Sequence, residues 1–579
     1  MKKFLKTVLA VICGLLIFNL IGFAILMMFG SAFSKTEPII PTSGILKVDL
    51  SKVIVAEQAR EDLTFSSTEQ IQTIGLRQAT QAIRNAAQDP GVKCIYLKPD
   101  GLNIGTANIM EFRKALSDFR SSGKPVVAYT ENPSTGGYYL ASVADKVWVA
   151  SYQGATPMLT GISSQMMFLS DLLQKLGIKV QLIRHGKYKS AGEMYIRNSS
   201  SPENRQQTQA FVDAIWEAFA SEIALSRGIS VGELNAAIDD LRLCLPSDYI
   251  EWGLADEIVD RAALEQKLSV LAGVDSFEQV QMIPFAEYLK THQKNNFRSP
   301  NKIAIIYANG QIMDGMSLSD VAGDRFASIA ESVRKDSTIK AVVLRVNSPG
   351  GSVVASEKIK NELDLLAKEK VLVASYGDYA ASGGYWISNG ADKIYCSPST
   401  LTGSIGVFGM IPDLSGFYED VAHIGVESVS SNKHGDMYSL SRPLNEEEIA
   451  FQQRSIEAVY NKFVRIVSDG REMTPAEVDA IAQGRVWAGS DAVRIGLVDE
   501  IGTLEDALGY AATAAGNSDL SNWNVVEYPK PLSWIDELTA LFSNTEETDF
   551  SIYSRWYENW KKGKYEVVFA DLPYRLEIR

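Results

Sequence analysis

The strongest constraint on the fold of this chain is an internal duplication. The segments TGGYY at 135–139 and ADKVW at 144–148 match SGGYW at 382–386 and ADKIY at 391–395, each pair 247 residues apart. Three further pairs follow the same order: VKCIYLK at 92–98 with IKAVVLR at 339–345, LTG at 159–161 with LTG at 401–403, and GLADEI at 253–258 with GLVDEI at 496–501. Five ordered matches at nearly one spacing predict two copies of one structural unit.

Each copy alternates short β-branched runs with helical patterns. In the second copy, strands are predicted at Ile303–Tyr307, Ala341–Val346 and Val371–Tyr376, and helices at Ala355–Lys368 and Glu446–Val467. Such alternation predicts an α/β fold in which right-handed crossovers join parallel strands.

The length and the duplication together indicate the domain organisation. A chain of 579 residues suits two to four domains. The predicted parts are an N-terminal membrane anchor at 1–36, a first α/β unit at 37–290, a second α/β unit at 301–516, and a C-terminal tail at 517–579. The polar stretch at 290–302 is the predicted linker, and the tail has no predicted structure.

The first 36 residues resemble a single membrane-spanning segment. Lys2, Lys3 and Lys6 precede an uncharged, mostly apolar run at 7–33. This run exceeds the ~7–15 residues of a signal-peptide core and reaches the ~20 residues that a spanning helix needs. The lysines predict a cytoplasmic N-terminus, with the rest of the chain on the periplasmic side of the inner (cell) membrane. The alternative is a long cleaved signal with a site near 30–32.

Composition argues against several classes of function. With 56 basic and 70 acidic residues, the chain has a net charge of −14 and no basic run after its first few residues, so no nucleic-acid partner is expected. The four cysteines form no CxxC pair and the four histidines show no zinc-ligand spacing, so neither a metal nor a cofactor is expected.

Two glycine-rich segments of the second copy are candidates for catalysis. Gly350 and Gly351, in NSPGGS at 347–352, could aim backbone N–H groups at an oxyanion, and Ser404, between glycines in TGSIG at 402–406, could be a nucleophile. Each segment alone is more often a plain turn. In the first copy, however, Ile162 replaces the serine and the glycine loop is missing, and this joint loss suggests that the two features work together.

A nucleophilic serine needs a base, and several groups are available. His423 and His434 lie in no recognisable motif, whereas the first copy offers Lys187 and Lys189 in RHGKYKSA at 184–191. A lysine serves as a base when loss of hydration brings its pKa from ~10.4 toward ~7–8.

These segments together resemble the long type of the signal peptide peptidase A (protease IV) family. The similarity runs from the anchor to about Gly502 and includes RVNSPGGS at 345–352, SGGYWIS at 382–388, STLTGSIGVFG at 399–409 and GKYKSA at 186–191. The resemblance implies tandem Clp-protease/crotonase-like units and a serine–lysine dyad. By motif, the nucleophile is Ser404 and the base is Lys189, with Lys187 as second choice, and a hydroxyl beside the lysine is assigned to Ser431 or its neighbour Ser430.

The resemblance also implies a mechanism and partners. Lys189 would activate Ser404, while N–H groups of Gly351 and of Ser404 or Ile405 would hold the oxyanion. The implied substrates are cleaved signal peptides and other apolar, extended peptides at the membrane, and the implied assembly is a homotetramer. Two other functions stay open: a non-catalytic membrane scaffold, and acyl-coenzyme A chemistry on the same fold.

Overall fold

The computed structural model describes residue 14 and residues 40–59, 71–154, 159–292, 295–318, 320–530 and 568–570. Contacts divide the chain into Met1–Thr42 and Ser43–Arg579, and every element described below belongs to the second part. Apart from Gly14, the predicted anchor at 1–36 lies outside the described residues. Over the ranges just given, none of the helices combines the length and the apolar character of a membrane span.

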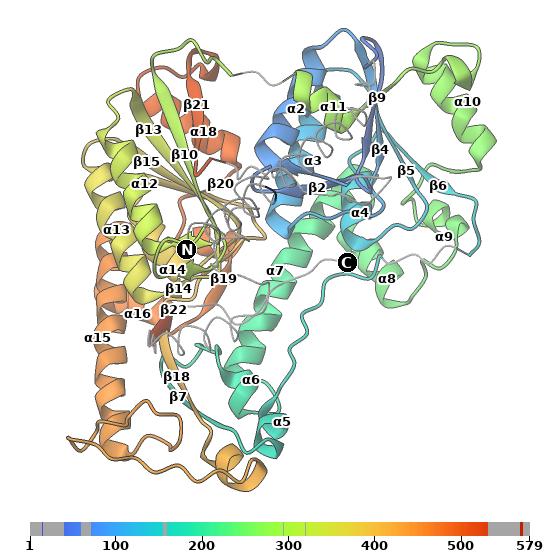
Figure 1. Cartoon of the computed structure of the whole chain (residues 1–579). Helices are drawn as coiled ribbons and strands as arrows, with labels where there is room; N and C mark the ends of the chain where they lie inside the picture. Colours follow the sequence, from blue (N-terminus) through green and yellow to red (C-terminus); the bar gives the residue numbers. More distant parts are fainter. Residues whose placement is uncertain are drawn as a thin grey trace. The chain divides into compact units, whose positions relative to one another are not determined.

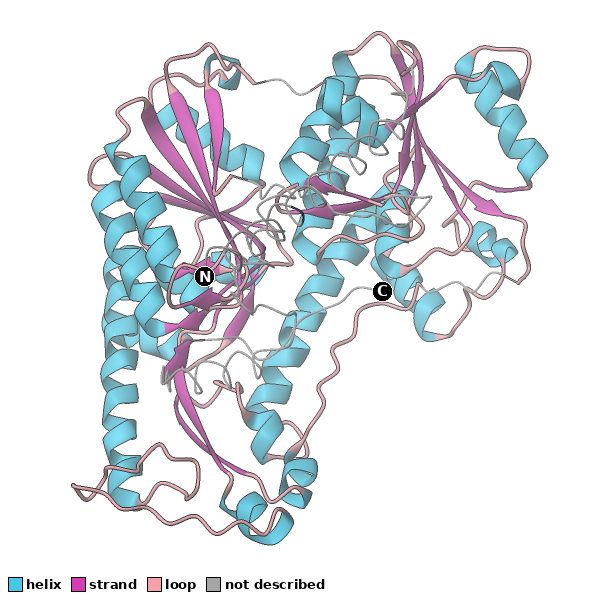
Figure 2. Ribbon diagram, in the orientation of Figure 1, coloured by secondary structure: helices cyan, strands magenta, loops and turns pink. Residues whose placement is uncertain are grey.

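The first copy of the repeat forms a six-stranded parallel sheet in the order β8-β6-β5-β4-β1-β9 (Figures 1 and 2). Its strands are β1 (Gly44–Asp49), β4 (Val92–Lys98), β5 (Val126–Thr130), β6 (Lys146–Ala150), β8 (Glu257–Val259) and β9 (Met282–Pro284). The main helices are α2 (Leu76–Gln88), α3 (Thr106–Ser121), α4 (Thr135–Ala141), α7 (Pro202–Arg227), α8 (Val231–Asp239), α9 (Pro246–Glu251), α10 (Arg261–Ala272) and α11 (Phe285–Thr291).

The second copy repeats this plan in a mostly parallel eight-stranded sheet. Its strands are β10 (Lys302–Asn309), β13 (Ile339–Ser348), β15 (Val371–Ala381), β16 (Lys393–Cys396), β17 (Leu401–Gly403), β19 (Val486–Ala488), β20 (Glu500–Ile501) and β21 (Asn524–Tyr528). The helices are α12 (Gly323–Lys335), α13 (Val353–Ala367), α14 (Gly383–Ser388), α15 (Glu446–Arg471), α16 (Pro475–Ile481), α17 (Gly489–Arg494) and α18 (Leu504–Ala514). The predicted strands and helices of this copy are therefore present as β10, β13, β15, α13 and α15.

The second sheet extends beyond the predicted domain boundary. Strand β21 lies in the segment 517–579 that was expected to be a tail, yet it pairs in parallel with β10 over five residues. Because the two strands are far apart in sequence, their pairing leaves no local pattern in the chain.

A third sheet joins the two copies. Its order is β12-β11-β14-β22-β18-β7. The strands are β7 (Lys179–His185), β11 (Ile312–Met313), β12 (Val321–Ala322), β14 (Gly351–Ser352), β18 (Val407–Asp413) and β22 (Val568–Ala570). β7 comes from the first copy and pairs antiparallel with β18 of the second over seven residues. A fourth, two-stranded sheet pairs β2 (Val53–Ala56) with β3 (Gln72–Gly75).

Buried charges also connect the copies. The Arg345 guanidinium at the end of β13 is fully buried and lies 2.8 Å from a carboxylate oxygen of Glu57 and 2.8 Å from one of Glu111, both in the first copy. Asp378 of β15 accepts a hydrogen bond of 2.7 Å from the N–H of Ala107 in α3. Burial raises the pKa of Asp378 to about 6, and the nearby Glu57 carboxylate acts in the same direction. Within this cluster, Arg345 lies two residues before the glycine loop at 347–352 and contacts the first copy.

Candidate active site

Lys189 and Ser404 meet where the two copies join. The Nζ atom of Lys189 lies 3.0 Å from Oγ of Ser404, and the two residues are only 1% and 0% exposed. Lys189 follows β7, whereas Ser404 lies between β17 and β18. The structure therefore brings together, within one chain, the two residues that the sequence selected.

The backbone around Ser404 is a tight turn. Ser404 has a φ of 50° and follows Gly403 with a φ of 76°. A left-handed conformation at a residue other than glycine costs ~1–3 kcal/mol and persists only where its surroundings enforce it. Here the Ser404 N–H donates a 2.7 Å hydrogen bond to the carbonyl of Arg485. Of the two N–H groups expected to assist Gly351, those of Ser404 and Ile405, the N–H of Ser404 is therefore bonded within the protein.

The backbone of Lys189 is held by the second copy. Tyr188 donates its N–H to the carbonyl of Gln483 at 2.9 Å. The side chain of Gln207 donates to the Tyr188 carbonyl at 3.0 Å and accepts the Val486 N–H at 3.1 Å. Hydrogen bonds thus hold the residue before Lys189 to β19, the edge strand of the second sheet, and to the residues just before it.

Gly484 is a site residue that the sequence analysis missed. It has a φ of 76°, and a Cβ atom placed there would lie 2.5 Å from Cβ of Lys189. Only glycine lets the two backbones approach so closely. The sole sequence signal is one glycine in a turn, and its importance depends on a contact with the other copy.

Lys189 also contacts a second buried hydroxyl, which belongs to Ser382. Nζ of Lys189 lies 2.9 Å from Oγ of Ser382 and 3.4 Å from the carbonyl oxygen of Ser404. Ser382 is fully buried directly before α14, and its N–H donates to the carbonyl of Gly403 at 2.8 Å. The hydroxyl beside the lysine is therefore provided by Ser382.

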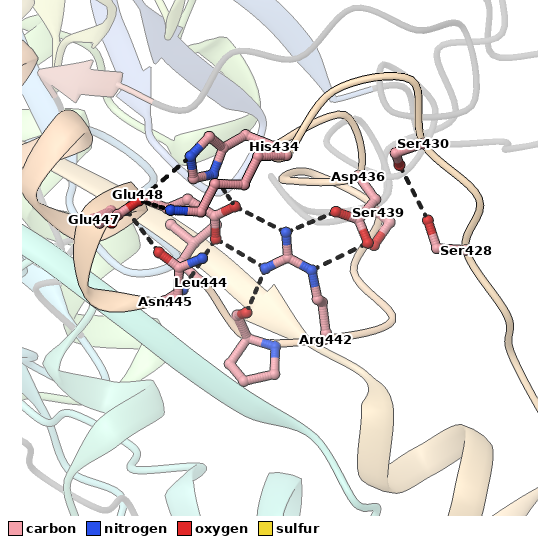
Figure 3. A network of polar contacts seen from close by, with 12 residues as sticks. Ser428, Ser430, His434, Asp436, Ser439, Arg442, Leu444, Asn445, Glu447 and Glu448 are labelled. Atoms are coloured by element: carbon pink, nitrogen blue, oxygen red, sulfur yellow. Dashed lines mark hydrogen bonds and ion pairs between the residues drawn. The ribbon is translucent and has the colours of Figure 1, made fainter.

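The assignment of Ser431 was wrong. Ser431 is exposed and its hydroxyl donates to Asn432 at 2.8 Å, while Ser430 pairs with Ser428 at 3.4 Å (Figure 3). Both lie in the long connection between β18 and α15, whose path the sequence does not specify.

That connection is fastened to the start of α15 instead of to the active site. Arg442 contacts Asp436 at 2.7 Å and Glu448 at 2.8 Å, and Nδ1 of His434 lies 2.9 Å from Glu448 (Figure 3). Hydrogen bonds from Arg442 lower the pKa of Glu448 to about 2. His434 is thus part of this surface network, and His423 and Lys187 are also exposed.

The glycine loop has a shape that side chains would block. Gly350 and Gly351 have φ values of 107° and 148°, and a Cβ on Gly351 would lie 2.0 Å from the carbonyl oxygen of Ile312. A Cβ on Gly383 would lie 3.1 Å from Cα of Gly350. Because Ser382 contacts both Lys189 and Gly403, residues 382–384 connect this loop to the nucleophile turn.

The strand β22 lies between β14 and β18, beside these groups. It runs antiparallel to β14 and to β18, so that position 569 lies opposite Ser352 on one side and opposite Phe408 on the other. β18 begins three residues after Ser404, and a strand antiparallel to it therefore runs toward the nucleophile. The space between β14 and β18 therefore accommodates an extended segment of polypeptide.

The described residues contain no group of three or more His, Cys, Asp or Glu side chains that could hold a metal ion.

Comparison with known proteins identifies the family of this chain. The model of peptidase family S49 matches residues 118–275 and 364–518. Protease 4 of Salmonella typhi is 38% identical over 534 residues, which cover 88% of this chain and 83% of the relative. The chloroplastic serine protease SPPA of Arabidopsis thaliana is 30% identical over 482 residues, which cover 81% and 70%.

The chain belongs to peptidase family S49 and is a serine protease. A solved structure of a ClpP1 mutant from Listeria monocytogenes overlaps 35% of this chain and 94% of its own, with 14% identity and a TM-score of 0.25.

Proposed function

We propose that this chain hydrolyses peptide bonds with Ser404 as nucleophile and Lys189 as general base. The observation that carries the proposal is the 3.0 Å contact between two buried groups from different copies. Removal from water disfavours the ammonium form of a lysine, and the neutral amine is the form that accepts a proton.

The reaction proceeds in two halves. Lys189 takes the proton of the Ser404 hydroxyl while the serine oxygen attacks the carbonyl carbon of the scissile bond. The resulting ammonium then gives this proton to the leaving amine, which leaves an acyl-enzyme on Ser404. Water attacks the ester with Lys189 again as base, so the acid is released and both side chains are regenerated.

The oxyanion is assigned to the glycine loop. The N–H of Gly350 already has the Ser348 hydroxyl as an acceptor at 3.2 Å, so the N–H of Gly351 is the stronger candidate donor. One well-placed donor contributes ~2.7–4 kcal/mol to stabilisation of the transition state.

The proposed substrates are apolar, extended peptides, including cleaved signal peptides. The position of β22 between β14 and β18 supports extended binding, because a peptide can make the same backbone pairs. The apolar run at 7–33 supports a single membrane anchor, with the catalytic part on the periplasmic side. Clp-protease/crotonase-like units remain the proposed fold family.

A homotetramer is the proposed assembly. Exposed apolar side chains support self-association, because such patches mark interaction surfaces. Six of the exposed apolar side chains lie in α5 (Ser170–Lys175), directly after it, or in the connection that follows β18: Leu172, Leu176, Val421, Ile424, Val426 and Val429.

The test is peptidase activity of the full chain in detergent on an apolar fluorogenic peptide between pH 6 and 10. We expect Ser404→Ala and Lys189→Ala to lose activity and Lys187→Ala to keep it. Labelling by a fluorophosphonate should require Ser404. A folded wild type that neither cleaves nor is labelled would instead support the scaffold, and thioester cleavage without peptidase activity would support acyl-coenzyme A chemistry.

A further inference from the structure

We propose that Ser382 is a positioning residue that orients the amine of Lys189 toward Ser404. The inference rests on the proposed function, because it assigns a role in the same proton transfer. A neutral amine has two N–H bonds and one lone pair, and only the lone pair can take the serine proton.

The distances around Nζ match this requirement. The Oγ atom of Ser382 at 2.9 Å and the carbonyl oxygen of Ser404 at 3.4 Å accept the two N–H bonds. With both N–H bonds directed at these acceptors, the lone pair faces Oγ of Ser404 at 3.0 Å. Without the Ser382 acceptor, rotation about the last side-chain bond would let an N–H bond point at the nucleophile.

The backbone of Ser382 is strained in a way that supports this role. Its φ of 54° and ψ of −111° belong to a region that favours glycine, and the cost for another residue is ~1–3 kcal/mol. Glycine would adopt this conformation without strain, yet the position carries a hydroxyl. The strained backbone of Ser382 is retained together with a buried hydroxyl that contacts Lys189, which indicates that this hydroxyl has a function.

The first copy of the repeat shows how the hydroxyl at this position is used when the backbone is regular. At the matching position of the first copy, the Thr135 hydroxyl donates to the carbonyl of Gly161 at 3.0 Å, and Thr135 is the first residue of the regular helix α4. In the second copy, the carbonyl of Gly403 takes the backbone N–H of Ser382 instead, at 2.8 Å. The changed backbone therefore releases the hydroxyl from a structural bond, and in the structure that hydroxyl contacts the lysine.

The decisive variant is Ser382→Gly, which removes the hydroxyl and the strain together. We expect kcat to fall ~10²-fold, because a general base contributes ~10²–10⁴-fold and loses much of this when misdirected. KM should change less than threefold. The midpoint of thermal unfolding should stay within a few degrees, since relief of strain offsets the greater freedom of glycine in the unfolded chain.

Two further variants distinguish loss of the orientation of Lys189 from the general effect of removing a buried hydroxyl. Ser382→Ala removes the hydroxyl and keeps the strain, and it should show the same loss of kcat. Ser388→Ala removes a hydroxyl that is 1% exposed on the same short helix and bonds Tyr376 at 2.9 Å, and it should keep wild-type kcat. The loss at Ser382 should persist at every pH from 6 to 10.

Four results would overturn the inference. The first is a kcat of Ser382→Gly within threefold of wild type, and the second is a loss of kcat that parallels a large loss of thermal stability. The third is recovery of activity of the variant at one end of the pH range. The fourth is fluorophosphonate labelling at Ser382 in Ser404→Ala, which would make Ser382 a nucleophile. A wild type without peptidase activity or labelling would instead refute the proposed function itself.

Discussion

The two copies of the repeat share a scaffold but use the same connection in opposite ways. Helices α7 and α15 each have 26 residues and begin 244 positions apart. The segment before α7 carries Lys189, whose side chain is buried against the second copy. The segment before α15 is exposed and is tied to its own helix through Arg442 (Figure 3). The duplication thus gave two similar structural units, and only the first extends this connection into the other unit.

The nucleophile turn shows the reverse asymmetry. Gly161 and Gly403 have similar φ values of 84° and 76°, so both copies keep a left-handed glycine at this place. Only the second copy follows its glycine with a serine, because Ile162 stands at that place in the first. The copies therefore share the glycine but differ at the next residue, because Ser404 has a φ of 50° and Ile162 has no positive φ.

The largest effect is expected when the nucleophile is moved between copies. Ser404→Ala should lower kcat/KM by ~10⁴-fold or more, as loss of a nucleophile generally does. Adding Ile162→Ser should not restore activity, because Lys433, the counterpart of Lys189, pairs with Glu447 and the first copy lacks the glycine loop. Steady-state hydrolysis of the fluorogenic peptide measures both variants, and recovery in the double variant would show that the copies are interchangeable.

Removal of a lysine should have different effects in the connection before α7 and in the connection before α15. Lys189→Ala should lower kcat by ~10²–10⁴-fold, since the base is lost. The matched control is Lys433→Ala, at the equivalent place before α15, where the lysine is exposed and pairs with Glu447. Its activity should stay within twofold of wild type, because an exposed ion pair contributes at most ~1 kcal/mol. Equal losses in both variants would contradict the assignment of the base.

A smaller effect is expected at the contact between the copies. Gly484→Ala should lower kcat ~10²-fold, because its methyl group would displace Lys189. Gly228→Ala has a similar φ of 67° with no atom within 4 Å of the added methyl. It should lose ~1 kcal/mol of stability without loss of activity. Kinetics and thermal unfolding of both variants provide the comparison, and a fully active Gly484→Ala would be evidence against the close approach.

The smallest effect concerns the buried charges that join the copies. The pKa of Asp378 is raised to about 6 in the folded protein, so the folded state binds this proton more tightly than the unfolded chain. The stability that this group contributes is therefore present below pH ~4 and is lost as the pH rises to about 6, by at most ~3 kcal/mol. Urea unfolding should show the stability of Asp378→Asn, relative to wild type, rising between pH 4 and pH 7. Parallel pH dependences would contradict this.

Much of the second copy was predictable from sequence. Runs of β-branched residues located β10, β13 and β15, because strands buried on both faces are almost continuously apolar. Comparison of the copies identified Ser404, because the first copy lacks both the serine and the glycine loop in a sequence that otherwise repeats. Lys189 came from the family resemblance, because nothing local separates a buried lysine from an exposed one.

The remaining site residues depend on contacts that leave no local pattern. Ser382 was missed because Thr135 at the matching position also has a hydroxyl, and the copies differ there in backbone conformation. Ser431 was misplaced because the long connection before α15 has no regular periodicity. Gly484 and β22 act through pairing with distant segments.

The distance in sequence between the two reacting groups has a consequence for biosynthesis. Lys189 and Ser404 are 215 residues apart. A ribosome that adds ~5–20 residues per second makes the lysine roughly 10–40 s before the serine. Throughout that interval the growing polypeptide carries a base without a nucleophile, so proteolytic capability arises only once most of the chain has been made and folded.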